Sequence, residues 1–277
     1  MIKDIIVNLE LNKSRDSVGD YAISVAESFD AHLVGVAFGG ILGVPNYFMP
    51  GLPPYVFDDA LRESNQLASA ALERFEAASK RNALSIECRL DTESNSSPAA
   101  NFSEMARHFD LSIVMQSDES SDIDSSLLIE STLFDSGRPM VIVPFIQKEI
   151  MVLERVICCW DGSSAAARAI NDSLPFLKKA DVTELFTVAS EKTEGANGLR
   201  GTDMANHLAR HGVKVEMAAL PGADMDVANV VLSHAADCGA SMIVMGGYGH
   251  SRLREFVLGG ATRGILSTMT VPVFMSR

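Results

Sequence analysis

The 277-residue chain repeats one order of apolar strands and amphipathic helices, once in each half. Two pairs of segments show the repeat best: "FDLSIVM" at 109–115 corresponds to "CGASMIVM" at 238–245, and "GRPMVIVPF" at 137–145 corresponds to "MTVPVFMS" at 269–276. Strands that alternate with helices in this way favour a parallel sheet that is covered on both faces. The sequence therefore predicts an internal duplication, with two tandem α/β domains of about five strands each.

The predicted elements follow the same order in both halves. In the first half we expect strands at 4–11, 32–38, 84–90, 111–117 and 139–145, and helices at 14–30, 61–83, 100–110 and 127–137. In the second half we expect strands at 155–160, 182–189, 214–220, 240–246 and 271–277, and helices at 163–180, 198–212, 226–239 and 261–269. The domains predicted from this order span 1–148 and 152–277, with a very short linker near 147–153. Each is expected to be an open, twisted, Rossmann-like sheet.

Composition excludes several classes of protein. The net charge of −13 argues against non-specific binding of nucleic acid, which needs a basic surface. No apolar run approaches the ~20 residues that cross a bilayer, and residues 1–10 lack the pattern of a signal peptide, so we expect no membrane contact and a cytoplasmic protein. The four cysteines show neither a disulfide framework nor the spacing of a paired-cysteine zinc site, and no metal site is expected.

Six glycines stand between Met245 and Leu266, directly after an apolar strand and before a predicted helix. In doubly wound sheets, ligands bind beyond the carboxyl ends of the strands. A loop of small residues that leads into a helix N-terminus can hold a phosphate with its backbone N–H groups. The pattern is neither a Walker A motif nor the tighter Rossmann spacing. On spacing alone, turns and close packing explain these glycines equally well.

Asp161 follows the first strand of the second half in "CCWDGSS", at a carboxyl end. Its carboxylate can accept hydrogen bonds from a sugar hydroxyl or a base amino group. Alternatively, Asp161 belongs to a helix-capping turn with Ser163 or Ser164, which is the common fate of an Asp-Gly-Ser sequence.

The spacing Gly246-x2-Gly249-x9-Gly259, the position of Asp161 and the closing "VPVFMS" resemble the universal stress protein family, and the whole chain resembles a tandem member of it. The resemblance implies ATP, or AMP or ADP, in the second domain, with Mg²⁺ as an optional companion of ATP. It places Asp161 at the adenine, the Val188 backbone against it and Gly246 near the ribose. The remaining candidate binding residues are Gly162, Ser163, Gly249, His250, Gly259, Gly260, Ala261 and Thr262.

The chain departs from the family pattern at Gly260, where the family usually has Ser or Thr. The backbone N–H remains but the hydroxyl donor is lost, and a hydrogen bond to a charged phosphate contributes about 1.5–3 kcal/mol. Thr262 or Ser251 can replace that donor. Additional cations are available from Arg252, Arg254 and Arg263, which are otherwise solvated surface residues.

The first half lacks the glycine turn. Its corresponding loop carries acidic residues, Asp118, Glu119, Asp122 and Asp124, and Glu10 takes the place of Asp161. Like charges would repel a polyphosphate, so the first domain is expected not to bind ATP. This half also contains a Pro- and Gly-rich segment at 38–59. Tyr47, Phe48 and Met49 at its centre form either a partner surface or a loop folded over the protein.

The glycine loop and the family resemblance together imply a regulatory nucleotide-binding stress-response protein, and the sequence shows no catalytic residue. A slow ATPase and a nucleotide-free scaffold for dimerisation or partner binding are the alternatives. His207 and His211 have the i, i+4 spacing of a metal pair, but a solvated helix face explains them better. Because the two domains end in similar apolar strands, we expect them to pair as an intramolecular pseudo-dimer; association of two chains into a homodimer is left open.

Overall fold

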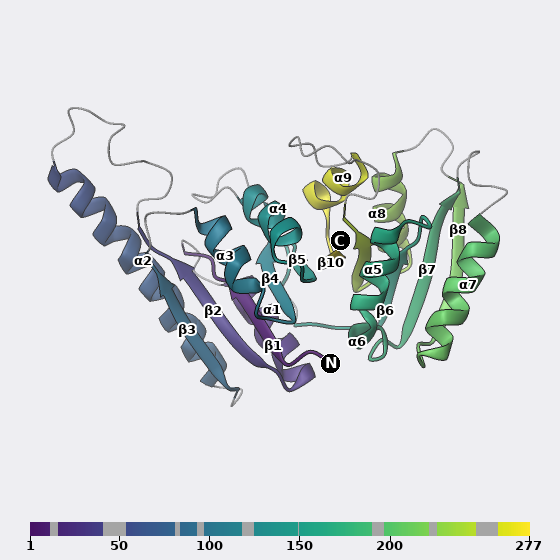
Figure 1. Cartoon of the computed structure of the whole chain (residues 1–277), viewed down its shortest axis with the longest axis horizontal. Helices are drawn as coiled ribbons and strands as arrows, with labels where there is room; N and C mark the ends of the chain where they lie inside the picture. The colour runs from purple at the N-terminus through teal and green to yellow at the C-terminus, as the bar shows by residue number, and fades with distance from the viewer. Residues whose placement is uncertain are drawn as a thin grey trace. The chain divides into compact units, whose positions relative to one another are not determined.

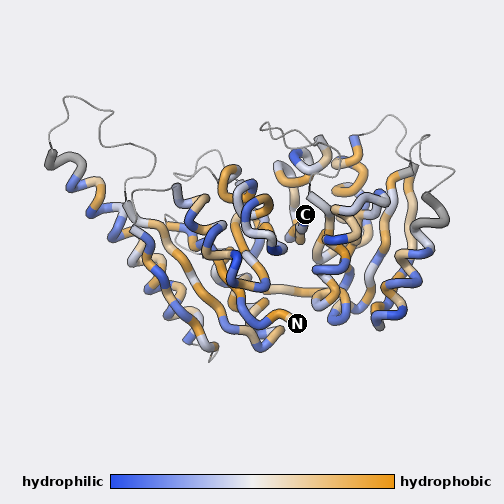
Figure 2. Tube along the Cα trace, viewed as in Figure 1, coloured by the Kyte–Doolittle hydropathy of each residue, from blue (hydrophilic) through white to orange (hydrophobic). Residues whose placement is uncertain are grey.

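The computed structural model describes residues 1–11, 16–40, 54–80, 84–92, 97–117, 125–148, 150–189, 197–221, 226–247 and 260–277. It divides into two compact units, Met1–Arg138 and Pro139–Arg277, which are described separately. In both, the strands are largely hydrophobic and the helices carry the hydrophilic residues (Figure 2). None of the helices in these ranges is long and apolar enough to cross a membrane.

The first unit contains a parallel sheet with the strand order β3-β2-β1-β4. Its elements are β1 (Asp4–Asn8), α1 (Ser17–Phe29), β2 (His32–Phe38), α2 (Pro54–Lys80), β3 (Ile86–Asp91), α3 (Pro98–Ala106), β4 (Leu111–Met115) and α4 (Ser125–Asp135) (Figure 1). Every residue of β4 is buried, as expected for a strand with both faces covered.

The second unit contains the parallel strands in the order β10-β9-β6-β7-β8. Its elements are β5 (Met140–Val143), β6 (Arg155–Cys159), α5 (Ser164–Asp172), α6 (Leu174–Leu177), β7 (Val182–Ala189), α7 (Asn197–Arg210), β8 (Val215–Pro221), α8 (Val227–Asp237), β9 (Met242–Gly246), α9 (Gly260–Thr268) and β10 (Val273–Ser276). The α/β fold predicted from the alternation of strands and helices is confirmed.

Strand β5 belongs to the second unit by its contacts and pairs antiparallel with β10. The sequence analysis counted this segment as the last strand of the first domain. Pairing between strands is a tertiary property that the local pattern of side chains does not encode. The domain limits at 148 and 152 stay a prediction.

Two helices differ from the expected ranges. The helix expected at 163–180 is interrupted at Ser173, because Pro175 has no N–H to continue the helical hydrogen bonds and instead lies in the first turn of α6. Helix α2 begins at Pro54, earlier than expected, so the end of the 38–59 segment is helical. Tyr47, Phe48 and Met49 lie outside the described residues.

Candidate functional site

Strand β6 lies at the point where the connections of the second unit change direction. It pairs with β7 on one side and with β9 on the other, all three in parallel. From β6 the chain therefore proceeds to one side for β7 and β8 and returns on the other side for β9 and β10. The carboxyl ends of the two strands at such a switch point flank the usual ligand crevice of a doubly wound sheet.

Asp161 lies directly beyond the carboxyl end of β6. Its Oδ1 accepts a hydrogen bond from the Ser163 backbone N–H at 2.8 Å, and Gly162 between them has a φ of 80°. Ser163 is the N-cap of α5, and its hydroxyl accepts the Ala166 N–H at 3.1 Å. The capping alternative from the sequence therefore holds for Ser163, while Asp161 shapes the preceding turn and remains exposed.

Gly246 ends β9, the strand on the other side of the switch point. A Cβ at this position would lie 2.5 Å from both the backbone carbon of Ala165 and the backbone nitrogen of Ala166. No side chain fits there unless α5 moves, because the obstructing atoms are backbone. Close packing between β9 and the first turn of α5 thus explains this glycine, whether or not it also contacts a ligand.

Helix α9 begins at Gly260, which is exposed. A Cβ at Gly260 would meet no atom of the described chain within 4 Å. Arg263 is exposed as well, whereas Thr262 is only 5% exposed. The first backbone N–H groups of a helix have no partner within the helix and attract anions. Among the described residues, none obstructs a ligand group or an added side chain at Gly260.

Strand β7 extends beyond its neighbour β6 at this edge. The last pair between the two strands is Cys159 with Phe186, and β7 continues to Ala189. Val188 therefore lies past the end of β6, near the carboxyl end of β7. Between β6 and Asp161, the buried indole N–H of Trp160 has no hydrogen-bond acceptor in the described part of the chain.

The two cysteines beside this edge are unreactive thiols. Burial, reinforced by the Asp161 carboxylate, raises the pKa of the Cys159 thiol to about 12, and burial also raises the pKa of Cys158. Both thiols are uncharged at neutral pH, so neither is an activated nucleophile.

The family model for "Universal stress protein family" matches residues 153–277, which include every strand of the switch point. The second half of the chain is therefore similar to the universal stress protein family, as its glycine spacing and Asp161 predicted. Universal stress protein YxiE from Bacillus subtilis is 28% identical over 149 residues, which cover 46% of this chain and 100% of that protein. Universal stress protein Slr1230 from Synechocystis is 22% identical over 141 residues, which cover 50% of this chain. The match spans about half of that relative, 47% of its length.

The fold of a universal stress protein extends over both halves. The crystal structure of one from Archaeoglobus fulgidus superposes with a TM-score of 0.75, covering 99% of this chain and 98% of that chain at 15% identity. Another universal stress protein from Archaeoglobus fulgidus is solved in complex with dAMP, but its TM-score of 0.35 is too low to assign a ligand to this chain.

The corresponding edge of the first unit is built differently from that of the second unit. After β1, the carbonyls of Glu10 and Leu11 accept hydrogen bonds from Arg74 Nη2 at 3.3 and 3.1 Å. Helix α1 begins after Asp16, whose Oδ1 accepts the Gly19 N–H at 2.9 Å. Burial, helped by nearby carboxylates, raises the pKa of Asp16 to about 7. A buried carboxyl thus caps the helix where α5 has a serine.

Several predicted site residues lie outside the described ranges. They include the middle of the glycine stretch and the acidic loop of the first half: Gly249, His250, Ser251, Arg252, Arg254, Gly259, Asp118, Glu119, Asp122 and Asp124. The roles that the resemblance gave to them, and to the described residues of the site, stay predictions. His207 and His211 pack edge to face at 4.5 Å, and His207 Nε2 lies 3.1 Å from Asn171 Oδ1.

The fold brings together one group of side chains that could hold a metal ion and that the sequence did not single out, namely Glu184, His234 and Cys238. Two signals were present in the sequence. Glu184 is a single charged residue within an apolar strand, and His234 and Cys238 have the i, i+4 spacing of one helix face. Neither signal identifies the other, because some 50 residues of sequence separate the strand from the helix.

Proposed function

We propose that the second half of the chain binds an adenine nucleotide, ATP or its relatives AMP and ADP, at the carboxyl edge of β6, β7 and β9. The observation that carries the proposal is the switch point at β6 in a domain similar to the universal stress protein family, with Asp161, Gly246 and the start of α9 in the segments around it. Asp161 would accept a hydrogen bond from the adenine or the sugar, and Val188 would contact the base through its backbone.

The phosphates would lie at the start of α9. In the proposal the backbone N–H groups of Gly260, Ala261 and Thr262 donate to them, together with Gly249, His250 and Gly259 from the preceding loop. Exposed Arg263 adds positive charge at this helix end. Because Thr262 is buried, its backbone is a better candidate donor than its hydroxyl. Mg²⁺ would accompany ATP on the phosphates.

Binding would be regulatory rather than catalytic. The thiols next to the site are kept protonated by burial, and the resemblance assigns the remaining residues to ligand contacts rather than to chemistry. A nucleotide shifts the balance between two conformations only by as much as it prefers one of them. We therefore propose that ATP alters the surface that this stress-response protein presents to a cytoplasmic partner. A slow ATPase is the catalytic alternative.

A nucleotide-free scaffold is the second candidate function. The observation that favours it is Gly246, whose lack of a side chain is already required by packing against α5. The antiparallel pairing of β5 with β10 is a further observation in its favour, since it joins the final strands of the two sequence repeats. In this function the repeats pair as a pseudo-dimer, and a homodimer or another protein partner uses the remaining surface.

The test begins with purified full-length protein, from which any retained ligand is released and identified by mass spectrometry. ADP and ATP are then titrated calorimetrically into wild type, Gly260→Ser and Gly260→Ala. The serine hydroxyl restores the donor that the family pattern has, so we expect the nucleotide to bind about 10–100-fold more tightly to Gly260→Ser.

Gly260→Ala is the matched control, because it adds a Cβ and helix propensity without a hydroxyl. If the serine and alanine variants bind nucleotide with equal affinity, the phosphates do not lie at the start of α9 as proposed. Absence of any nucleotide binding would instead favour the scaffold, and turnover well above background would favour the ATPase.

A further inference from the structure

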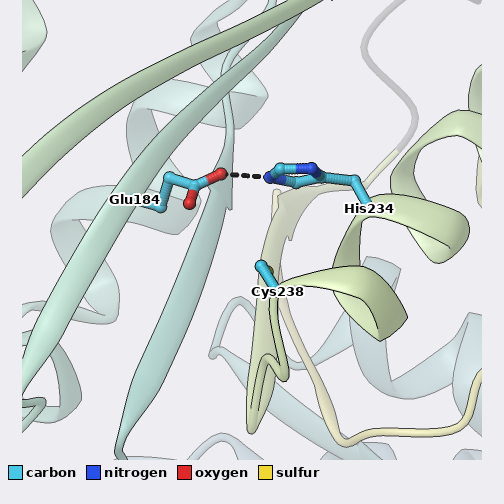
Figure 3. A group of neighbouring side chains, drawn as sticks. All are labelled: Glu184, His234 and Cys238. Atoms are coloured by element: carbon cyan, nitrogen blue, oxygen red, sulfur yellow. Dashed lines mark hydrogen bonds and ion pairs between the residues drawn. The ribbon is translucent and has the colours of Figure 1, made fainter.

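Three side chains with metal-binding chemistry converge on one point of the second unit (Figure 3). Glu184 comes from β7, His234 from the last turn of α8, and Cys238 is the C-cap residue of that helix. One donor atom from each of the three, Oε1, Nε2 and Sγ, lies within 4.8 Å of the other two. The spacing of i, i+4 places His234 and Cys238 on the face of α8 that packs against β7.

Two of the three donor groups are held in a fixed orientation. The imidazole of His234 stacks on the ring of Phe186 with centroids 4.3 Å apart and planes 8° from parallel. Its Nε2 thereby faces Glu184, with which it forms a hydrogen bond to Oε1. The other carboxylate oxygen of Glu184 accepts a hydrogen bond from Arg155 Nη1 at 2.9 Å.

We propose that Glu184, His234 and Cys238 bind one transition-metal ion of the Zn²⁺ class, with a fourth position left for water. An imidazole, a carboxylate and a thiolate are the donors that Zn²⁺ takes in proteins. Mg²⁺ and Ca²⁺ prefer sites made of oxygen atoms alone, so the nitrogen and sulfur donors disfavour them. Phe186 and Arg155 supply the surrounding contacts that orient a metal-binding histidine and carboxylate.

The geometry requires only small adjustments. In a tetrahedral zinc site, with bonds of about 2.0–2.3 Å, neighbouring donor atoms are roughly 3.3–3.7 Å apart. Donor atoms spread over up to 4.8 Å therefore need to approach by about an ångström, which rotation of the Cys238 side chain can provide. The hydrogen bond between Glu184 and His234 has to open slightly, so that the ion takes the place of the shared proton.

The charges around the cluster balance with the ion bound. A thiolate at Cys238 and the carboxylate of Glu184 neutralise a divalent cation. The nearby cation, Arg155, has a second partner in Glu216, whose Oε2 lies 3.3 Å from Arg155 Nη1. Glu184 is 5% exposed and the His234 side chain is 17% exposed. The ion would be largely shielded from solvent yet reachable from it.

The competing explanation is a metal-free chain of ion pairs from Arg155 through Glu184 to His234, which ties α8 to the sheet. That arrangement accounts for the carboxylate and the imidazole but gives no role to the thiol beside them. Within the described ranges, the Cys238 thiol donates one long hydrogen bond, to the Ala235 carbonyl at 3.8 Å. The thiol is therefore the group that separates the two explanations.

The metal site is independent of the proposed nucleotide site. Glu184 is the third residue of β7, whereas Val188 is near its carboxyl end, and the two helix residues lie at the end of α8. The test therefore needs no nucleotide and does not depend on whether one binds.

The experiment uses full-length protein freed of metals by a chelator and titrated with Co²⁺, whose spectrum reports its ligands. We expect one Co²⁺ per chain, visible d–d bands of a tetrahedral ion, a sulfur-to-cobalt charge-transfer band in the near ultraviolet, and displacement by Zn²⁺. Cys238→Ser should abolish the charge-transfer band and weaken Zn²⁺ binding by more than roughly 100-fold. That loss exceeds the roughly 10–100-fold typical of mutating a residue that contacts a metal ligand but not the metal.

Two control variants carry the same residue types at other places. Cys88→Ser removes an exposed thiol of the first unit, and His211→Gln removes an exposed imidazole directly after α7. Both should leave the cobalt spectrum unchanged, whereas His234→Gln should lose the ion as Cys238→Ser does and serves in its place if the serine variant does not fold. A missing charge-transfer band in wild type, or a band that survives Cys238→Ser, would overturn the proposal in favour of the ion-pair chain.

Discussion

Asp16 is a buried acid whose ionisation should weaken the first unit as the pH rises. Its Oδ1 caps α1 through the Gly19 N–H, but its Oδ2 is buried without a hydrogen-bond partner in the described chain. Burial is the largest cause that raises its pKa from 3.8 to about 7, and Glu10 and Asp20 add to the rise; the Gly19 hydrogen bond and Arg74 oppose it. Replacement by asparagine keeps the capping oxygen and the shape but removes the charge.

The magnitude follows from the pKa difference between the folded and unfolded chain. A rise from 3.8 to about 7 corresponds to roughly 4 kcal/mol, at 1.36 kcal/mol per pKa unit. Between these two pH values the folded protein holds a proton that the unfolded chain has released, so the free energy of unfolding falls as the pH increases. This contribution is fully present below pH 3.8 and is lost above about pH 7.

We therefore expect Asp16→Asn to lose this pH dependence and to be more stable than wild type at pH 8 by about 2–4 kcal/mol. Urea unfolding of both proteins at pH 5 and pH 8, followed by far-ultraviolet circular dichroism, measures the difference. Fluorescence of the single tryptophan, Trp160, follows the second unit separately. Titrating groups that do not interact with Asp16 contribute equally to both proteins and cancel in the comparison.

Asp226→Asn is the matched control, because Asp226 also caps a helix through its carboxylate, which accepts the Ala228 N–H of α8, but is exposed to solvent. It should change the free energy of unfolding by little, and by the same amount at both pH values. If Asp16→Asn keeps the full pH dependence of wild type, or is the less stable protein at pH 8, the reasoning about the buried carboxyl is refuted.

Three further predictions concern the second unit. Gly246→Ala should destabilise it by roughly 1–3 kcal/mol or more, since the new methyl overlaps the backbone of α5. A lower melting temperature without nucleotide would show this loss, and an unchanged melting temperature would contradict the packing explanation. Ser163→Ala should cost about 1 kcal/mol through loss of the α5 cap, measured by urea unfolding. Calorimetry with ADP should give one site per chain, and two sites would show that the first unit also binds.

Much of the fold could be predicted from the sequence because its signals are local. The apolar strands and helical spacing depend on neighbouring residues, so the order of elements in both halves was readable, and the position of Asp161 after β6 followed from it. Pro175 indicates the helix break at Ser173, but the helical spacing of apolar residues continues on both sides of it and predicts one helix. The early start of α2 at Pro54 was hidden by a segment rich in proline and glycine.

The candidate site was predictable only in part. Asp161 and Gly246 were placed correctly at strand ends, but the sequence offered a ligand as the reason for the glycine, and the structure adds the backbone of α5 as a second reason. The exposure of Gly260 and the burial of Thr262 likewise depend on how α9 packs, including the close approach of Gly264 to Ala228 in α8.

By itself, the sequence determined the two repeats, the order of their strands and helices, and the acidic loop of the first half, since each of these depends on residues that are neighbours in the chain. The tertiary structure alone decided that β5 pairs with β10, that β6 lies between β7 and β9, and that Glu184 meets His234 and Cys238. Those contacts join residues far apart in the chain, and they are selected by the burial of whole faces of the sheet rather than by any local pattern.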